Sequence, residues 1–172
     1  MMRLFIAINF NPDTRARLLT LRDELRDKSS AGNFSEPENI HLTLVFLGEC
    51  DAGQASAVRS VMDAVCFEPF PIAITRIGKF SRQGGEIWWA GVRESGPLLA
   101  LQRSLTNGLL NAGFAVDARD YRPHITLGRE VRTAERPREL DPFGETVSAI
   151  DLMKSERIKG KLTYTAIYTI SK

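Results

Sequence analysis

The chain contains only two histidines, His41 and His124, and both stand in the same short pattern, His-x-Thr-Leu. A glycine follows each copy, Gly48 after the first and Gly128 after the second. A single buried histidine is more often structural than catalytic, but structural histidines have no reason to share a pattern and its flanks. We therefore interpret both histidines as residues that perform chemistry.

The spacing inside each copy suits a phosphate group. Residues i and i+2 of a β-strand point to the same side, with Cα atoms about 6.5–7 Å apart. His41 would thus act beside Thr43, and His124 beside Thr126. An imidazole changes its charge near neutral pH, so one histidine can serve as a base while the other serves as an acid. Threonine hydroxyls can donate hydrogen bonds to phosphoryl oxygens, so two converging strands would cleave a phosphodiester in line without a metal ion.

Several other residues have simpler explanations than catalysis. Trp88 and Trp89 are adjacent in an expected strand, so one should lie in the core while the other could offer its ring to a nucleobase. We expect Phe46 and Phe80 to lie in the core. Three basic residues could face an RNA, but we expect them at solvated surface positions: Arg76, Lys79 and Lys154.

The bulk composition is that of a soluble globular protein. The 172 residues suggest one domain spanning 1–172, or two halves that share one core. The formal net charge is +2 at pH 7, without the basic surplus of a nonspecific nucleic-acid binder. Any recognition of phosphate should therefore be local.

Cysteine usage and the apolar segments indicate a cytoplasmic protein. Cys50 and Cys66 have no metal-type spacing, so we predict no metal site and two free thiols in a reducing compartment. The apolar start at residues 4–10 is too short for a signal peptide and lacks a small-residue cleavage site. No segment approaches the ~20 apolar residues that span a bilayer, so we expect no membrane partner.

The pattern of apolar residues predicts alternating strands and helices. Asn11-Pro12-Asp13 opens the first helix, with Asp13 as the capping candidate, and Asp51 caps the second. The expected helices cover about 12–28, 52–66 and 97–112. The expected strands cover 4–10, 40–47, 70–80, 87–92, 114–116, 123–129, 147–155 and 161–171. We expect loops at 31–39, with room for a short strand, and at the polar, proline-containing segment 131–145.

Several of these strands are linked as hairpins, which favours an α+β fold with antiparallel sheet over a doubly wound parallel fold. Each half of the chain supplies one His-x-Thr strand and long amphipathic helices. The simplest organisation is a monomer with two lobes related by a pseudo-twofold axis. In that arrangement, the two motif strands face each other.

The paired His-x-Thr-Leu pattern resembles the 2H phosphoesterase superfamily. Several segments resemble its RNA 2′,3′-cyclic phosphodiesterase branch, which was first named for 2′-5′ RNA ligation: residues 3–8, 39–48, 78–80, 89–91 and 122–129. The resemblance implies a bilobal fold with a central cleft. It also implies that no metal or other cofactor is needed to hydrolyse RNA 2′,3′-cyclic phosphate ends, or small cyclic nucleotides, to 2′-phosphates.

The resemblance also implies roles for individual residues. His41 corresponds to the proton donor for the leaving 3′ oxygen and His124 to the proton acceptor that activates water, although the near symmetry of the motifs would allow the opposite assignment. Thr43 and Thr126 correspond to the groups that bind phosphoryl oxygens. Arg129 matches a basic residue that follows the second motif.

Strict alternation along the strand would place Arg129 on the face opposite His124, so its role requires a bend at Gly128. Tyr164 and Ser155 match family positions and could reach the site. Without that role, both would be strand residues with ordinary hydrogen bonds.

Three alternative functions remain open at this stage. The same histidines would serve a 2′-5′ RNA ligase that joins tRNA halves, or an enzyme that opens a small cyclic phosphate of the ADP-ribose type. The third is a noncatalytic module that binds RNA ends. Two titrating groups argue against this third function, because binding alone does not need them.

Overall fold

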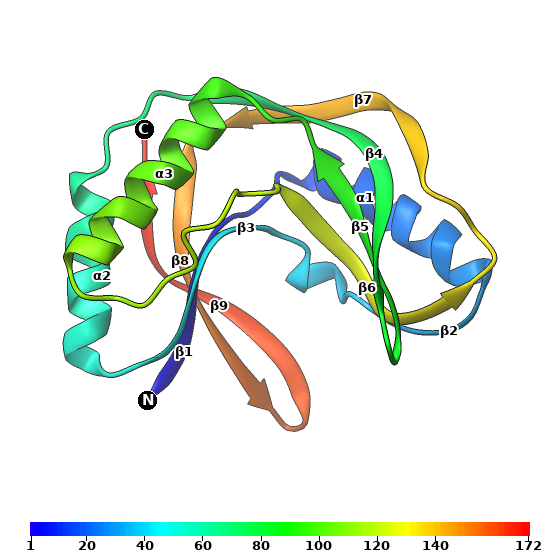
Figure 1. Cartoon of the computed structure of the whole chain (residues 1–172), viewed down its shortest axis with the longest axis horizontal. Helices are drawn as coiled ribbons and strands as arrows, with labels where there is room; N and C mark the ends of the chain where they lie inside the picture. The colour runs from blue at the N-terminus through cyan, green and yellow to red at the C-terminus, as the bar shows by residue number, and fades with distance from the viewer.

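The computed structural model describes residues 1–172 as two antiparallel sheets with three α-helices (Figure 1). The first sheet has the order β3-β1-β8-β9 and the second the order β2-β6-β5-β4-β7. The helices are α1 (Pro12–Asp27), α2 (Ala52–Ala64) and α3 (Gly96–Asn111), with a short 3-10 helix, η1, at Pro37–Asn39. The strands are β1 (Met2–Ile8), β2 (Ser29–Phe34), β3 (Leu42–Cys50), β4 (Phe70–Arg82), β5 (Gly85–Val92), β6 (His124–Thr133), β7 (Arg138–Val147), β8 (Ala149–Ile158) and β9 (Lys161–Ser171).

The helices divide between the sheets. Helices α2 and α3 pack against each other and against the first sheet, whereas α1 packs against the second. Figure 1 shows the two motif strands, β3 and β6, between these helical layers, with the β4–β5 and β8–β9 hairpins projecting to the lower side of the view. None of the helices combines the length and apolar character that crossing a bilayer demands.

Both sheets contribute to the largest cluster of buried hydrophobic residues. Ile6 of the first sheet and Ile74 of the second are each fully buried in it. Phe5, Ala7 and Met153 form a separate small cluster on the other face of the first sheet. We call this face, which α2 and α3 do not cover, the inner face of the first sheet.

The helix starts follow capping chemistry closely. The Asn11 side chain accepts a hydrogen bond from the Thr14 amide, so Asn11, and not the expected Asp13, is the N-cap of α1. Asp51 and Gln54 form a reciprocal capping box at α2, as an acidic cap there predicts. Each helix thereby satisfies an amide that would otherwise lack a partner.

Two local expectations were wrong. Residues 131–145 do not form a loop, because β6 continues to Thr133 and β7 pairs with β4 at the edge of the second sheet. Only Val147 of β7 is buried, so the polar composition of this edge strand resembled that of a loop. Pro142 falls in an irregular stretch of the pairing. The expected strand at 114–116 is not formed. Segment 31–39 contains β2 and η1.

The capping assignment of α1 can be tested by two substitutions. Asn11→Ala removes the acceptor for the Thr14 amide and should lower the free energy of unfolding by about 1 kcal/mol in urea titrations. Asp13→Ala is the matched control and should cost less, because it removes only a charge near the positive end of the helix dipole. A larger loss for Asp13→Ala than for Asn11→Ala would contradict the assignment.

Candidate active site

Both imidazoles are held by main-chain carbonyls two residues before them. His41 Nδ1 lies 2.7 Å from the Asn39 oxygen, and His124 Nδ1 lies 2.6 Å from the Arg122 oxygen. A carbonyl can only accept, so each Nδ1 carries a proton. The neutral form of each ring therefore presents its lone pair at Nε2. Two motifs from separate sheets thus share one tautomer.

The threonine of the first motif contacts its histidine directly. His41 Nε2 lies 2.8 Å from Thr43 Oγ1, as the i, i+2 spacing predicts. Thr43 and Thr126 are both half-buried, so their hydroxyls are not sealed in the core. The site therefore offers an imidazole nitrogen and a hydroxyl on β3 and the same pair of residue types on β6.

The two motif strands lie close together although they belong to different sheets. The Tyr121 hydroxyl, just before β6, donates a 2.6 Å hydrogen bond to the Thr43 carbonyl on β3. The charge of His124 is also near enough to lower the pKa of His41. Both observations place the two imidazoles in one electrostatic environment.

A bulge in β6 turns Arg129 toward the histidines. Trp88 pairs with Gly128 and Trp89 with Thr126, which leaves Leu127 without a partner on β5. Leu127 and Gly128 are both buried, and Arg129 is exposed. The extra residue resets the alternation of faces, so the bend required for Arg129 is present. The charge of Arg129 lowers the pKa of both histidines and of Tyr164, so its charge acts on all three side chains.

Desolvation is the main reason that the pKa of each histidine lies below its usual value. For His41, burial lowers the pKa, the bond to the Asn39 carbonyl opposes this, and the charges of His124 and Arg129 lower it further. For His124, burial also dominates, opposed by the Arg122 carbonyl and reinforced by Arg129. A bound anion would offset the charge of Arg129 and raise both pKa values.

Aromatic rings border both histidines. Phe5 and Tyr164 lie with their ring centroids 4.9 and 5.2 Å from that of His41. Phe80 lies 5.3 Å from His124, and Trp89 lies 6.2 Å from it. Phe80 was expected in the core, but it is only half-buried because β4 turns it to the His124 side.

The tryptophan pair divides as alternation predicts. Trp88 is 1% exposed in the main core, and Trp89 is 7% exposed beside His124. Gly78 on β4 makes room for the Trp89 ring, since a Cβ there would approach it to 2.3 Å. Because so little of its ring is exposed, Trp89 serves mainly as a wall of the site.

Three basic residues occupy different surroundings. Arg76 places its guanidinium 4.9 Å from the Trp89 ring centroid, on the His124 side. Lys79 forms a 2.6 Å ion pair with Glu86 on the opposite face of the sheet, next to Trp88. Lys154 pairs with Glu156 at 3.4 Å. Only Arg76 of these three therefore lies on the side of the second sheet that bears His124.

A family model described as the 2′-5′ RNA ligase superfamily matches residues 10–159. The chain belongs to this superfamily. Several similar proteins carry the name RNA 2′,3′-cyclic phosphodiesterase, among them the following two. The one from Archaeoglobus fulgidus is 34% identical over 151 residues, covering 84% of this chain and 85% of the relative. The one from Methanothermobacter thermautotrophicus is 30% identical over 175 residues, covering 95% of each.

Solved structures of similar proteins share the whole fold of this superfamily member. The crystal structure of E. coli LigT complexed with 3′-AMP has a TM-score of 0.84 at 25% identity, covering 99% of this chain and 96% of that one. The crystal structure of TT0787 of Thermus thermophilus has a TM-score of 0.82 at 27% identity, covering 99% of this chain and 97% of that one. The predicted α+β fold and the resemblance to 2H phosphoesterases are confirmed, and the protein is a phosphodiesterase.

Two residues that hold the His-x-Thr motifs of this superfamily member in place, Asn39 and Ser35, were not identified from the sequence. Asn39 is 8% exposed, and its side-chain Nδ2 donates a 3.0 Å hydrogen bond to the Leu162 carbonyl of β9. Its main-chain carbonyl accepts the hydrogen bond from His41 Nδ1, so Asn39 links the β8–β9 hairpin to the imidazole. The only feature of the sequence that could point to this role is that Asn39 stands two positions before His41.

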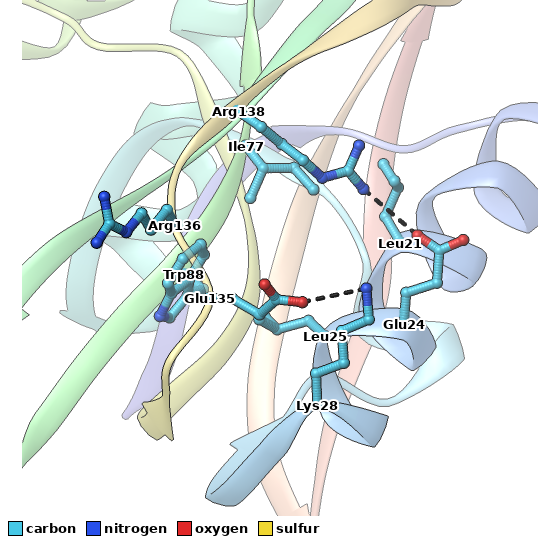
Figure 2. A pocket seen from close by; sticks show the side chains of 9 residues that line it. All are labelled: Leu21, Glu24, Leu25, Lys28, Ile77, Trp88, Glu135, Arg136 and Arg138. Atoms are coloured by element: carbon cyan, nitrogen blue, oxygen red, sulfur yellow. Dashed lines mark hydrogen bonds and ion pairs between the residues drawn. The ribbon is translucent and has the colours of Figure 1, made fainter.

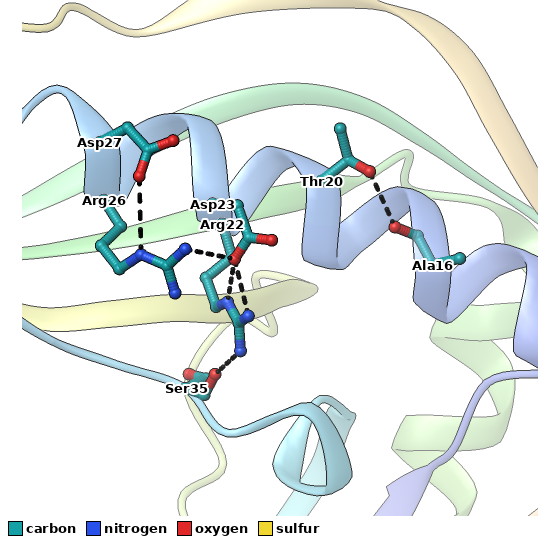
Figure 3. A network of polar contacts seen from close by, with 7 residues as sticks. All are labelled: Ala16, Thr20, Arg22, Asp23, Arg26, Asp27 and Ser35. Carbon is teal, nitrogen blue, oxygen red and sulfur yellow. Dashed lines mark hydrogen bonds and ion pairs between the residues drawn. The ribbon is translucent and has the colours of Figure 1, made fainter.

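Ser35 supports the second motif. Its hydroxyl donates to the Thr126 carbonyl at 2.9 Å, and its amide donates to the Leu127 carbonyl at 2.9 Å. Figure 3 shows the other side of this connection, where Arg22 of α1 donates to the Ser35 carbonyl at 2.7 Å and pairs with Asp23. Helix α1 is thereby tied through Ser35 to the backbone beside Thr126.

A small hollow of about 40 Å³ lies on the core side of the second sheet, between α1 and residues 135–138 (Figure 2). Ion pairs Lys28–Glu135 and Arg138–Glu24 close it. Trp88, and not Trp89, lines it, so it lies on the opposite face from His124. No group of three or more His, Cys, Asp or Glu side chains is arranged to hold a metal ion.

The Asn39 link can be tested by removing its side chain. Asn39→Ala should lower kcat on a cyclic phosphate substrate by about 10- to 100-fold, because the carbonyl that orients His41 loses its anchor. The His41 imidazole resonances should shift in the same variant. Asn107→Ala, at an exposed position of α3, is the control and should leave both unchanged. Unaltered kcat in a folded Asn39→Ala protein would contradict the link.

Proposed function

We propose that this protein hydrolyses RNA 2′,3′-cyclic phosphate ends to 2′-phosphomonoesters without a metal ion, through acid–base catalysis by His41 and His124. The observation that carries the proposal is the matched pair of imidazoles, each with Nδ1 bound to a carbonyl and with Nε2 available for proton transfer. The names of the relatives support the substrate class. The tether between Tyr121 and Thr43 supports their convergence.

The proposed reaction transfers one proton at each side of the phosphorus. His124 Nε2, as a lone pair, takes a proton from water while the water oxygen attacks the phosphorus in line. The bond from phosphorus to the 3′ oxygen breaks, and His41 as an imidazolium donates its Nε2 proton to that oxygen. The products are a 2′-phosphate and a 3′-hydroxyl. His124 then loses its proton to solvent and His41 regains one.

The neighbouring groups would bind the phosphoryl oxygens. The hydroxyls of Thr43 and Thr126 can each donate one hydrogen bond, and the Arg129 guanidinium supplies the positive charge. Thr43 is 2.8 Å from His41 Nε2 in the free protein, so a substrate would exchange this contact for one to a phosphoryl oxygen. Charge developing in the transition state would be stabilised by donors already in position.

Product analysis in the presence of EDTA tests the proposed function. Each nucleoside 2′,3′-cyclic phosphate and a short RNA ending in one should yield a 2′-phosphate, identified by chromatography against 2′- and 3′-standards. His41→Ala and His124→Ala serve as controls, each expected to lose ~10²–10⁴ in turnover while remaining folded. A 3′-phosphate product, or activity that chelation abolishes and a divalent ion restores, would refute the mechanism.

The matching family is described by a second reaction, the joining of RNA ends through a 2′-5′ bond, and this is the second candidate function. This reaction uses the same acid–base chemistry, with a 5′-hydroxyl in place of water as the group that attacks the phosphorus. Supplying an RNA with a 5′-hydroxyl end together with a cyclic phosphate end separates the two functions. Hydrolysis predicts a 2′-phosphate as the main product, whereas ligation predicts a longer RNA.

The pH dependence follows from the shifted histidines. Activity requires one imidazole protonated and the other neutral, so the rate should fall in acid, where both are charged, and in alkali, where both are neutral. Both pKa values lie below the usual ~6.5, so the bell of kcat/KM should be centred on the acidic side of that value. Bound substrate anion raises both pKa values, so the bell of kcat should lie at higher pH. Stopped assays across about pH 5–9 measure both profiles, and flat profiles would exclude imidazole acid–base catalysis.

A further inference from the structure

Phe46 in the first motif strand was expected in the core, but it is 50% exposed. An irregularity in β3 causes this. Leu44 has no partner on β1, so Val45 turns into the core and Phe46 pairs directly with Phe5. Directly opposite residues of an antiparallel pair share one face. Phe46 therefore lies on the inner face of the first sheet, which also carries Phe5.

Phe46 is paired on the sheet with Phe5, whose ring contacts the histidine site. The Phe5 ring centroid is 4.9 Å from that of His41 and 5.0 Å from that of Tyr164. Phe46 is the next side chain along the same face, with its Cβ about 4.5–5.5 Å from that of Phe5. A flat group placed on Phe46 would thus lie one side chain away from a ring that contacts His41.

A guanidinium completes the feature. Arg3 lies over the Phe46 ring at 4.9 Å from its centroid, and it makes no ion pair with any carboxylate. The charge of Arg3 also acts on Tyr164, next to His41. An exposed ring beside an unpaired guanidinium is the combination that stacks nucleobases and attracts phosphates in single-stranded nucleic acid.

We propose that Phe46 and Arg3 form a subsite that stacks an unpaired nucleobase of the RNA whose cyclic phosphate lies between the histidines. The proposal rests on the proposed function and specifies how the RNA end is bound. Every nucleobase has a π-face, so the subsite should bind all four bases with little discrimination. It should therefore favour substrates that carry a base over bare cyclic phosphates.

The experiment compares three substrates with and without the exposed ring. The substrates are a dinucleotide ending in a 2′,3′-cyclic phosphate, adenosine 2′,3′-cyclic phosphate, and a methyl riboside 2′,3′-cyclic phosphate that lacks a base. Phe46→Leu should lower kcat/KM on the dinucleotide by about 5- to 150-fold, the range that one base–aromatic stack contributes. The base-free substrate should be hydrolysed at an unchanged rate.

Two control variants separate stacking from general damage. Phe46→Tyr keeps a ring and should retain kcat/KM on the dinucleotide. Leu110→Ala removes another exposed apolar side chain, on α3, and should change nothing. If Phe46→Leu lowers kcat/KM on adenosine 2′,3′-cyclic phosphate as much as on the dinucleotide, the stacked base is that of the terminal nucleotide. A loss on the dinucleotide alone would assign it to the preceding one.

The outcomes also separate this inference from the proposed function. If the unaltered protein hydrolyses none of the three substrates, the proposed function fails. If it hydrolyses them but Phe46→Leu loses nothing on either base-bearing substrate, the subsite is refuted. An equal loss on the base-free substrate would refute it as well, because the ring would then support the fold or the phosphate site.

Discussion

The bond from each Nδ1–H to a main-chain carbonyl is the interaction on which the rest of the site depends. It fixes the tautomer, so that each neutral ring has its lone pair at Nε2, and it stabilises the imidazolium when that ring is protonated. Because the acceptor is backbone, the orientation of each histidine is set by how its strand begins. Asn39 anchors the carbonyl for His41 to β9, and Ser35 fixes the backbone of the second motif through Thr126.

Irregular strands determine which side chains join these histidines. A regular β3 would turn Phe46 into the core, and a regular β6 would turn Arg129 away from His124. The unpaired residues Leu44 and Leu127 each reset the alternation of faces. Gly128 permits the bulge in β6, since a Cβ there would come within 2.9 Å of the Phe34 ring. The pairing of β3 and β6 with their neighbouring strands therefore decides which side chains surround the histidines.

Much of this arrangement could be predicted from the sequence, because its signals are local. The repeated His-x-Thr pattern predicts a shared face for His41 and Thr43, and apolar spacing with a capping residue such as Asp51 predicts the helices. The α+β class followed from the hairpins. The edge strand β7 was missed because an edge strand buries too little to show apolar alternation.

Bulges were missed for a different reason. Their cause lies in the partner strand and in close contacts such as that of Gly128 with Phe34, which no periodicity of a single segment records. The same holds for Asn39, whose partner Leu162 is 123 positions away. Phe46 was accordingly assigned to the core, because regular alternation places it on the face opposite His41. Tertiary pairing, and not the character of the residue, decides its exposure.

The central claim is that two imidazoles from separate sheets bind one phosphate group. Because the chain has only two histidines, ¹⁵N-labelled protein gives two sets of imidazole signals that can be titrated individually. The measurement is the pKa of each histidine with and without one equivalent of a nucleoside 2′-monophosphate, the proposed product. The account predicts that both pKa values rise together on binding. A shift confined to one histidine, or to neither, would contradict it.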